Sequence, residues 1–365
     1  QHWLARATGT LKVPPSFSAV EPGDCIAFDI GEATPLKFRV DRIDRGDFLS
    51  LELTGFDPAS ARFGSASAGA DALSKPVKRA FGPPIIEFLD LPLATGTEPQ
   101  PWAPRVAAFA SPWTPVAVYR TVNGSNTLIA TVTAPTMMGE IVDGAFYSGP
   151  RSVWDYGNSL YVQFYGDAQL LSQTDEQVFD GANVVAVKAP SGDWEIVQFA
   201  QAELLATNKY KLSKLLRAQQ GTEAGMANPT PIGSRVIVLT PATLAMLGIT
   251  VDQLGQALTL RAGPAKDDPG ASSYFDYSVT PKGVGLRPFS VSQIKGRRPL
   301  GFGDAVITWS RRTRYGGDAW DPPDVPLNEQ SESYDLEVLD WAGNVLRTVS
   351  GLASPTWTYA LADQT

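Results

Sequence analysis

The sequence contains almost no cysteine and almost no histidine. Among 365 residues there is one cysteine, Cys25, and one histidine, His2. A disulfide needs two thiols, the usual zinc sites need several Cys and His ligands, and a serine hydrolase triad needs a histidine. The composition therefore excludes intrachain disulfides, thiol–imidazole pairs and zinc sites of that kind, and leaves only His2 for a Ser-His-Asp triad.

Long apolar runs and a basic surface are also missing. No segment approaches the ~18 consecutive apolar residues that a membrane helix needs, and the opening QHWLARATGT lacks the pattern of a signal peptide. The net charge is −8, and the 30 basic residues are scattered among 38 acidic ones. Duplex DNA would therefore be repelled on average. Because the chain begins at Gln1 without a methionine, we expect a section of a longer polypeptide.

The short motifs of common enzymes are absent as well. There is no Walker A loop, no G-x-G-x-x-G after a predicted strand, no H-E-x-x-H and no EF-hand loop. Glycoside hydrolysis by two carboxylates needs no histidine, so a glycan-binding or glycan-hydrolysing module stays an alternative. Trp309, Trp341 and Trp357 fall on or beside predicted strands, which favours a place in a core or interface over a sugar platform. We expect no catalytic site, no cofactor and no metal.

Glycine and proline, by contrast, are plentiful. The 33 Gly and 29 Pro separate short segments rich in β-branched and aromatic residues, a pattern typical of an all-β protein. The sequence predicts a mainly β, multidomain fold, which we divide into residues 1–78, 79–288 and 289–365.

The first part, residues 1–78, is predicted to be a small β-barrel or meander followed by a linker. Three segments, CIAFDI, KFRVDRI and FLSLELTGF, have strand patterns. Cys25 lies in the first of them and is expected to be a buried structural thiol. Residues 57–76 are small and polar, and so form the predicted linker.

The second part, residues 79–288, is predicted to be a central β-rich domain with few helices. The NGSN sequence at 123–126 predicts a hairpin turn between two strands. One helix is predicted within 240–258, where Thr240 resembles an N-cap and leucines recur at roughly helical spacing.

The third part, residues 289–365, has strand and hairpin patterns suited to one sheet of a β-sandwich. Arg311, Arg312 and Arg314 lie between aromatic residues, as in a platform for single-stranded nucleic acid. The many carboxylates that follow them favour a strand edge with local ion pairs instead.

A basic stretch, KYKLSKLLRAQQGTEAG, begins at Lys209. It follows a turn, a strand (WEIVQF) and the polar ATN sequence, which together predict a β-hairpin. Its lysines are expected to face solvent or a subunit contact. Arg217 and Glu223 are predicted to form an ion pair across the AQQG turn.

This hairpin resembles the signature of a known family. GDWEIVQFAQAELLATNKYKLSKLLRAQQGTE is similar to the pattern W-E-x-x-Q-F-x-x-A-E-L … Y-x-L-x-x-L-L-R-G-Q-x-G-T-E of the large tail-tip proteins of siphophage-like particles. These include the baseplate "megatron" proteins of gene transfer agents and, more distantly, J-like host-specificity proteins. The matching residues are Trp194, Glu195, Gln198, Phe199, Glu203, Tyr210, Leu215, Leu216, Arg217, Gly221, Thr222 and Glu223.

Other segments resemble the same family in the same order. VPPSFSAVEPGDCIAFD and FRVDRIDRGDFLSLELTGFDP look like its tail-hub β-domain, and FLDLPL and PRVAAFASPW look like the next segment. VITWSRRTRYGGDAWDPPDVPLNEQSESYDLEVLD looks like its downstream domain of fibronectin type III character. The resemblance covers most of the chain.

The resemblance implies a structural component of the tail tip in the virion, the baseplate hub. Such a protein is a homotrimer that contacts distal tail and hub proteins, with tape-measure protein or DNA in its lumen. It shapes or closes the DNA exit channel and supports attachment to a host envelope receptor through downstream domains. The family implies no membrane span and no catalytic residue in this part.

Three features depart from the family pattern. Ala218 stands where members usually carry Gly, which bears on a turn of positive φ. The fibronectin-like part has about five strand-length segments, fewer than the seven of a complete sandwich. The glycosidase-related region of gene-transfer-agent relatives has no counterpart here.

Overall fold

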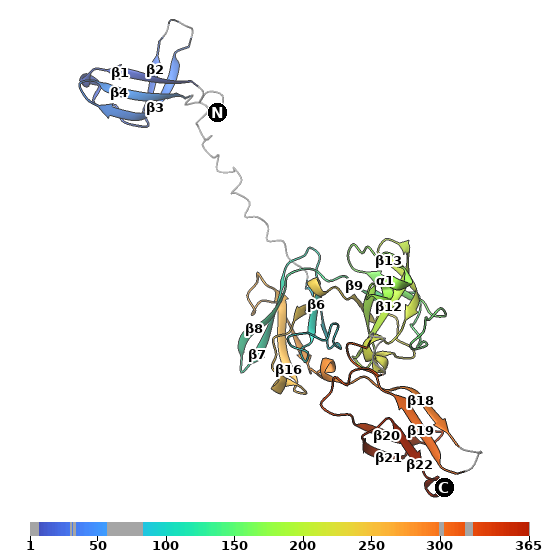
Figure 1. The fold of residues 1–365 in the computed structure, drawn as a ribbon. Helices are drawn as coiled ribbons and strands as arrows, with labels where there is room; N and C mark the ends of the chain where they lie inside the picture. Colours follow the sequence, from blue (N-terminus) through green and yellow to red (C-terminus); the bar gives the residue numbers. More distant parts are fainter. Residues whose placement is uncertain are drawn as a thin grey trace. The chain divides into compact units, whose positions relative to one another are not determined.

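The computed structural model describes residues 7–29, 31, 34–56, 83–298, 303–317 and 324–364. The fold is mainly β and includes several sheets, as the sequence predicts, with a single short α-helix among the described residues. Contacts divide the chain into two compact units, Gln1–Arg79 and Ala80–Thr365 (Figure 1). The three-part division stays a prediction, and the predicted linker at 57–76 lies outside the described residues.

The first unit contains a four-stranded antiparallel sheet of order β1-β4-β3-β2. The strands are β1 (Thr8–Val13), β2 (Cys25–Phe28), β3 (Leu36–Arg45) and β4 (Leu49–Gly55). The three predicted strands are confirmed. Cys25, however, is exposed, so the expectation of a buried thiol is wrong. Its side chain alternates with Ile26, which packs against the core, and therefore points to the opposite face.

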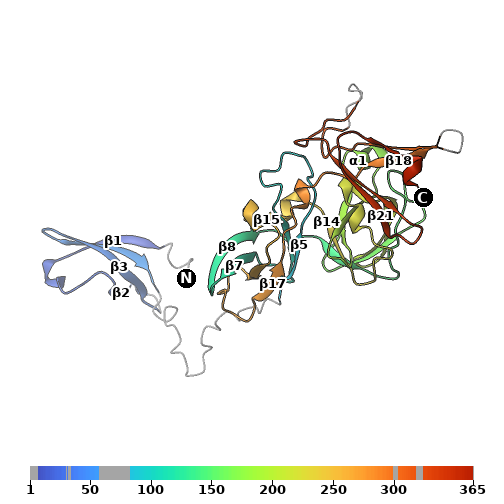
Figure 2. The ribbon, with the colours of Figure 1, turned by 90° about the horizontal axis from the view of Figure 1, so that it is seen from below.

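The second unit contains two open sheets, a closed barrel and a C-terminal group of strands. One sheet has the order β15-β6-β5, formed by β5 (Ile85–Leu89), β6 (Arg105–Phe109) and β15 (Ala245–Met246). The other has the order β17-β16-β7-β8, formed by β7 (Val116–Val122), β8 (Ser125–Val132), β16 (Leu258–Pro264) and β17 (Phe275–Val279). Figure 2 shows β7, β8 and β17 beside β5 and β15.

The sheet β15-β6-β5 packs against the barrel on one face and against the sheet β17-β16-β7-β8 on the other. On β6, Val106 and Ala108 pack with the core of the four-stranded sheet. Ala107, between them, packs with residues of the barrel's outer surface. Because successive side chains of a strand point to opposite faces, this explains why the apolar residues of β6 are consecutive rather than alternating.

The predicted hairpin turn at 123–126 is confirmed between β7 and β8. Asn123 and Gly124 both have positive φ, 49° and 78°, as a two-residue turn of the primed type requires.

The predicted helix within 240–258 is wrong. The segment contains 3₁₀ turns at Pro241–Thr243 and Val251–Gln253 and the short strand β15 between them. Leu247 donates its backbone N–H to Pro104, and Gly248 donates to Ile129. Leu247 and Ile249 are both buried, at a spacing of two. Tertiary hydrogen bonds and burial of alternate residues therefore override the weak helical spacing.

The closed barrel has the order β10-β13-β12-β11-β14-β9. Its strands are β9 (Met138–Ile141), β10 (Leu160–Phe164), β11 (Val184–Lys188), β12 (Trp194–Ala206), β13 (Lys209–Leu216) and β14 (Arg235–Val238). The helix α1 (Asp175–Phe179) precedes β11 and begins with a capping box at Thr174. Leu160, Val162 and Phe164 of β10 alternate into the barrel core.

The C-terminal strands form two small sheets, β18-β19-β22 and β20-β21. They are β18 (Ser292–Arg297), β19 (Ala305–Ser310), β20 (Tyr334–Leu339), β21 (Val345–Leu352) and β22 (Thr356–Tyr359). Trp309 is buried and Trp357 is half-buried, as expected. Trp341 is 99% exposed, so it does not lie in the core, and the other expected place, an interface, stays a prediction for it. It lies in the turn between β20 and β21, beyond the paired strands.

Arg311 and Arg314 form local ion pairs, as their acidic neighbours indicate, whereas Arg312 pairs with Glu223, 89 residues away. Arg311 contacts Asp324 at 2.7 Å, and Arg314 contacts Glu329 at 2.8 Å. Their charges are therefore neutralised within the chain rather than offered as an array to phosphates.

Candidate functional site

The predicted hairpin of the basic stretch is confirmed as the longest hairpin of the barrel. β12 and β13 pair in antiparallel register around a turn at Thr207 and Asn208. Phe199 of β12 and Leu215 of β13 are paired and lie in the barrel core. The hairpin therefore contributes two adjacent strands to the barrel wall.

Glu195 and Arg217 belong to the inward face of this hairpin at one end of the barrel. Glu195 is two residues from the core residue Val197, and Arg217 is two residues from Leu215. Residues two apart on a strand share a face. The alternation that buries the apolar residues thus also buries this acid and this base, and both side chains are completely inaccessible to solvent.

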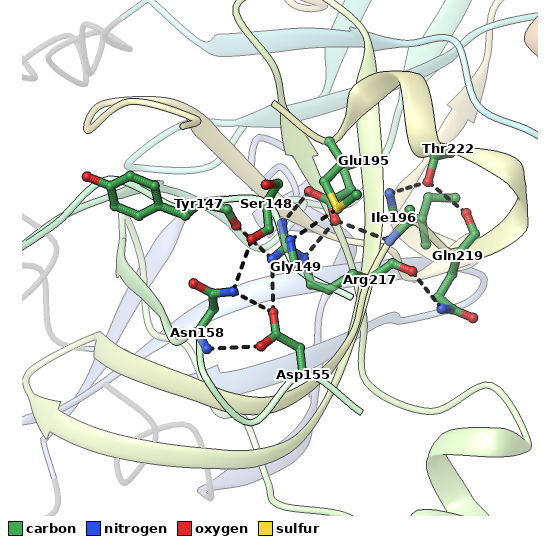
Figure 3. Close-up of polar contacts among 12 residues, drawn as sticks. Tyr147, Ser148, Gly149, Asp155, Asn158, Glu195, Ile196, Arg217, Gln219 and Thr222 are labelled. Atoms are coloured by element: carbon green, nitrogen blue, oxygen red, sulfur yellow. Dashed lines mark hydrogen bonds and ion pairs between the residues drawn. The ribbon is translucent and has the colours of Figure 1, made fainter. Parts of the chain in front are cut away.

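Arg217 uses its guanidinium to join two carboxylates (Figure 3). Its Nε and Nη2 donate to the two oxygens of Glu195, at 2.8 and 3.0 Å. Its Nη1 donates to Oδ2 of Asp155 at 3.2 Å and to the carbonyl of Tyr147 at 2.8 Å. The guanidinium also lies 3.9 Å from the ring centroid of Phe146. The planar fork of arginine suits this set of acceptors, which a lysine could not satisfy.

Asp155 links the network to the loop that precedes β10. Its Oδ1 accepts from the backbone N–H groups of Gly157 and Asn158, and its Oδ2 accepts from the Asn158 side chain. Burial by itself would raise the pKa of Asp155, but hydrogen bonds from Asn158 and Arg217 outweigh it and hold the pKa below its ordinary value. Asp155 is therefore held in the charged form that Arg217 needs.

Two small residues make room for the network. A Cβ atom on Gly149 would lie 2.1 Å from Oδ2 of Asp155 and 2.8 Å from Nη1 of Arg217, so only glycine fits there. Ala218 follows Arg217 with φ 48° and ψ 44°, the left-handed conformation that glycine adopts most readily. Its N–H donates to Glu195 at 3.1 Å. The turn of positive φ is thus formed even with alanine.

The rest of the signature turn closes over the start of β12. Thr222 accepts a hydrogen bond from the N–H of Ile196 at 2.9 Å and donates one to the carbonyl of Gln219 at 2.7 Å. Gly221 has φ +77°, and a Cβ atom there would lie 2.5 Å from the ring of Phe289. The turn is therefore tied to the barrel on one side and packed against Phe289 on the other.

Four further signature residues anchor neighbouring elements. The indole of Trp194 donates to the carbonyl of Phe88 on β5 at 3.3 Å. The side chain of Gln198 donates to the carbonyl of Val178 in α1 at 2.6 Å and to that of Ala182, after the helix, at 3.1 Å. The hydroxyl of Tyr210 donates to Ala168 at 2.9 Å. Leu216 packs with α1 through the buried Val178.

The other signature acids lie away from the network. Glu203 is exposed near the hairpin tip, with Lys211 at 4.0 Å. Glu223 pairs with Arg312 of the C-terminal strands, whereas Arg217 pairs with Glu195 and Asp155. The predicted Arg217–Glu223 ion pair is therefore wrong. The two residues are close in sequence, but Arg217 lies inside the barrel, whereas Glu223 pairs with Arg312 and its side chain is 14% exposed.

The lysines of the stretch are half-buried rather than fully solvent-facing. Lys209 contacts Asp143 and Lys214 contacts Asp175, each at 2.6 Å. Lys214 also lies 4.9 Å from the ring centroid of Trp154. They pack along the barrel wall and are paired, which is how long basic side chains cover apolar surface.

Sequence reasoning missed Asp155, Gly149 and Tyr147. Asp155 lies 62 residues before Arg217, so no local spacing connects them. The available signal was the sequence DYGN, 155–158, in which an Asp followed by Gly and Asn is typical of a turn that binds its own backbone. That pattern predicts a turn but not its partner.

The arrangement is suited to holding structure rather than to chemistry on a substrate. Arg217 is 1% exposed, Asp155 2% and Glu195 0%, so a substrate has no path to any of them. Among the described residues no group of His, Cys, Asp and Glu is arranged to hold a metal ion. No helix in the described part of the chain is long and apolar enough to cross a membrane.

Two family models match separate parts of the chain. Residues 136–237 match the model described as "Rcc01698-like, C-terminal", and this span contains the whole Arg217 network. Residues 1–43 match the model described as "Putative phage tail protein". A search of curated proteins finds no match. The chain is thus similar to phage tail proteins, and a structural role in a phage tail is supported.

Proposed function

We propose that this chain is part of the tail tip, as a baseplate hub protein of the megatron type, in a phage or gene transfer agent. What supports the proposal is the combination in one chain of the tail-protein match at 1–43 and the hairpin signature within 136–237. In this role the chain assembles as a homotrimer around the tail axis and contacts distal tail and hub proteins. The C-terminal strands are the start of a fibronectin type III-like domain.

The physical character of the described residues suits this role. A closed barrel whose end is fixed by buried ion pairs resists local opening. The net charge of −8 suits a channel wall along which DNA or tape-measure protein passes, because adhesion to phosphates needs basic contacts that release counterions. Host attachment then falls to domains beyond these strands.

Reconstruction of the intact particle by cryo-EM tests the proposal. We expect three copies in a ring at the distal end of the tail, with the barrel beside the channel. Copies spread along the outer tail surface, or a tip without threefold symmetry for this chain, would contradict it.

We further propose that this part of the chain is not an enzyme. The strongest candidate for a reactive cluster, around Arg217, is closed to solvent. Purified chain, with folding verified by circular dichroism, should neither hydrolyse nor bind peptidoglycan and capsule glycans. Hydrolysis or saturable retention of any of these glycans would instead favour the alternative, a glycan-binding or glycan-hydrolysing module.

A further inference from the structure

A short segment just after β19, residues 312–315, connects the C-terminal strands to the central part of the chain, and we call it the clasp. Nη1 of Arg312 donates a hydrogen bond to Oε1 of Glu223, which lies in the signature turn that follows β13. The two residues are 89 positions apart in the sequence. Their ion pair therefore links the C-terminal strands to the end of the barrel.

Two more side chains of the clasp contact the central part. Nη1 of Arg314 donates to the carbonyl of Gly285 at 2.8 Å. The ring of Tyr315 packs so closely on Gly96 that a Cβ atom there would lie 2.5 Å from it. The remaining clasp residue, Thr313, donates to the carbonyl of Tyr315 and so keeps the segment turned. Three of the four clasp side chains thus reach out of the C-terminal strands.

The connection between the two parts, residues 287–290, is anchored by one aromatic ring. The ring of Phe289 lies against Gly221 of the signature turn, where a Cβ atom would be 2.5 Å away. On the clasp side, the guanidinium of Arg312 lies 5.2 Å from the centroid of the same ring. The other three residues of the connection are exposed. Phe289 is therefore held between the signature turn and the clasp.

The carboxylate of Glu223 depends on Arg312 for its charge balance. The side chain of Glu223 is 14% exposed and that of Arg312 is 28% exposed. Oε2 of Glu223 is buried and accepts no hydrogen bond within the part of the chain that the structure describes. Loss of Arg312 leaves this largely buried charge uncompensated, which is costly. Separation of the clasp from the signature turn would return the carboxylate to water and relieve that cost.

The contacts described above are few and largely polar. Parts of a chain that meet in this way move relative to one another unless a large apolar interface prevents it, and hinges are a few residues between elements. We propose that the clasp is a releasable device that fixes the direction in which the C-terminal strands leave the barrel. When the contact between Arg312 and Glu223 is lost, these strands move as a body about residues 287–290.

The signature turn then has two tasks at one end of the barrel. Arg217 points inward and closes the barrel, whereas Glu223 holds the strands that follow. Arg312, which the sequence places among neighbouring arginines and aromatic residues, is used for this contact within the chain. The inference does not depend on where the chain lies in a particle.

A distance measurement between two spin labels on the full chain tests the clasp. The labels are attached at Leu204→Cys on β12 and Trp341→Cys in the turn after β20, which are 61% and 99% exposed, with Cys25→Ser to remove the native thiol. We expect one narrow distance distribution for this labelled chain. Arg312→Gln should broaden it and raise the population at other distances roughly tenfold or more, as loss of one partner of a buried charge pair does.

Arg347→Gln is the matched control. Arg347 pairs with Asp363 at 2.8 Å, but both residues lie within the C-terminal part, so this change should leave the distribution narrow. Hydrogen exchange in β19 and β20 distinguishes movement from unfolding. It should stay as slow in Arg312→Gln as in the labelled chain, because the strands move without losing their pairing.

The double variant Glu223→Gln, Arg312→Gln tests the pair itself. Both changes remove the same contact, so the double variant should be no broader than Arg312→Gln alone. Several results would overturn the proposal: a broad distribution before any change at the clasp, a narrow one in Arg312→Gln, or equal broadening by Arg347→Gln. Faster exchange in β19 and β20 of Arg312→Gln, or a double variant broader than the single one, would overturn it as well.

Discussion

Arg217 and Glu195 form a bidentate ion pair inside the barrel, with N···O distances of 2.8 and 3.0 Å and no solvent access to either side chain. The pair joins the end of β13 to the start of β12, and Asp155 extends it to the loop before β10. A buried pair of this kind is weak support for net stability, because removal of its charges from water offsets their attraction. Removal of one partner, however, leaves the charges of the others buried without an opposite charge.

Arg217→Met should therefore destabilise the second unit strongly. The substitution leaves two buried carboxylates without their cation, and we expect a loss of roughly 3–5 kcal/mol in the free energy of unfolding. Urea denaturation followed by circular dichroism measures it. Lys211→Met removes a cation from β13, where its partner Glu203 is 4.0 Å away and 66% exposed. This control should change stability by only about 0.5 kcal/mol or less. Equal losses of stability in the two variants would show that the buried ion-pair network does not stabilise this end of the barrel.

Acid should weaken the barrel through Asp155. Because the folded-state pKa of Asp155 lies below the ordinary value of 3.8, its charged form contributes stability above about pH 4, and this contribution is lost as the pH falls further. Asp155→Asn should lower stability at pH 6 and flatten its decrease between pH 6 and pH 2.5. Denaturant titrations across this range test it, with Asp252→Asn as the control for loss of an exposed carboxylate. If the stability of Asp155→Asn falls between pH 6 and pH 2.5 as steeply as that of the wild type, Asp155 is not the group responsible for the acid sensitivity.

Gly221→Ala should cost more than the same change at Gly192. Both positions have positive φ, +77° and +84°, so both substitutions introduce similar backbone strain. Only at Gly221 would the new methyl group meet a side chain, the ring of Phe289 at 2.5 Å, whereas Gly192 has nothing within 4 Å. We expect an additional loss of roughly 1–3 kcal/mol at Gly221 from this overpacking.

The double variant Gly221→Ala, Phe289→Ala separates clash from strain. Removing the ring should recover part of the additional loss, so the two changes should be less than additive in thermal or urea unfolding. Simple additivity would mean that Phe289 does not oppose the methyl group.

Thr222→Val should destabilise the signature turn through two lost hydrogen bonds. Valine keeps the shape of threonine but leaves the N–H of Ile196 and the carbonyl of Gln219 without the hydroxyl that each contacts. We expect a loss of roughly 1–3 kcal/mol. Thr222→Ser retains the hydroxyl and should retain most of the stability. Hydrogen exchange at the Ile196 amide gives an independent measure, since it should become faster in the valine variant and stay slow in the serine variant.

The hairpins of the fold were predictable because their signals are local. The strand-forming residues of 194–199 and 209–212 and the polar turn between them indicate β12 and β13 without any distant partner. The NGSN turn likewise carries its own positive-φ residues. The segment 240–258 was not predictable, because its leucines fit a helix and only contacts with Pro104 and Ile129 decide against one.

By itself, the sequence determined that this protein is built from short strands and has few cysteine and histidine side chains, and it showed that one hairpin resembles a family signature. Tertiary structure decided which charges meet. Arg217 pairs with Asp155 across 62 residues rather than with the nearby Glu223, and Trp341 is exposed rather than buried. The physical reason is that a strand pattern fixes which face a side chain takes, but only closure of the barrel and packing of the sheets fix what lies opposite that face.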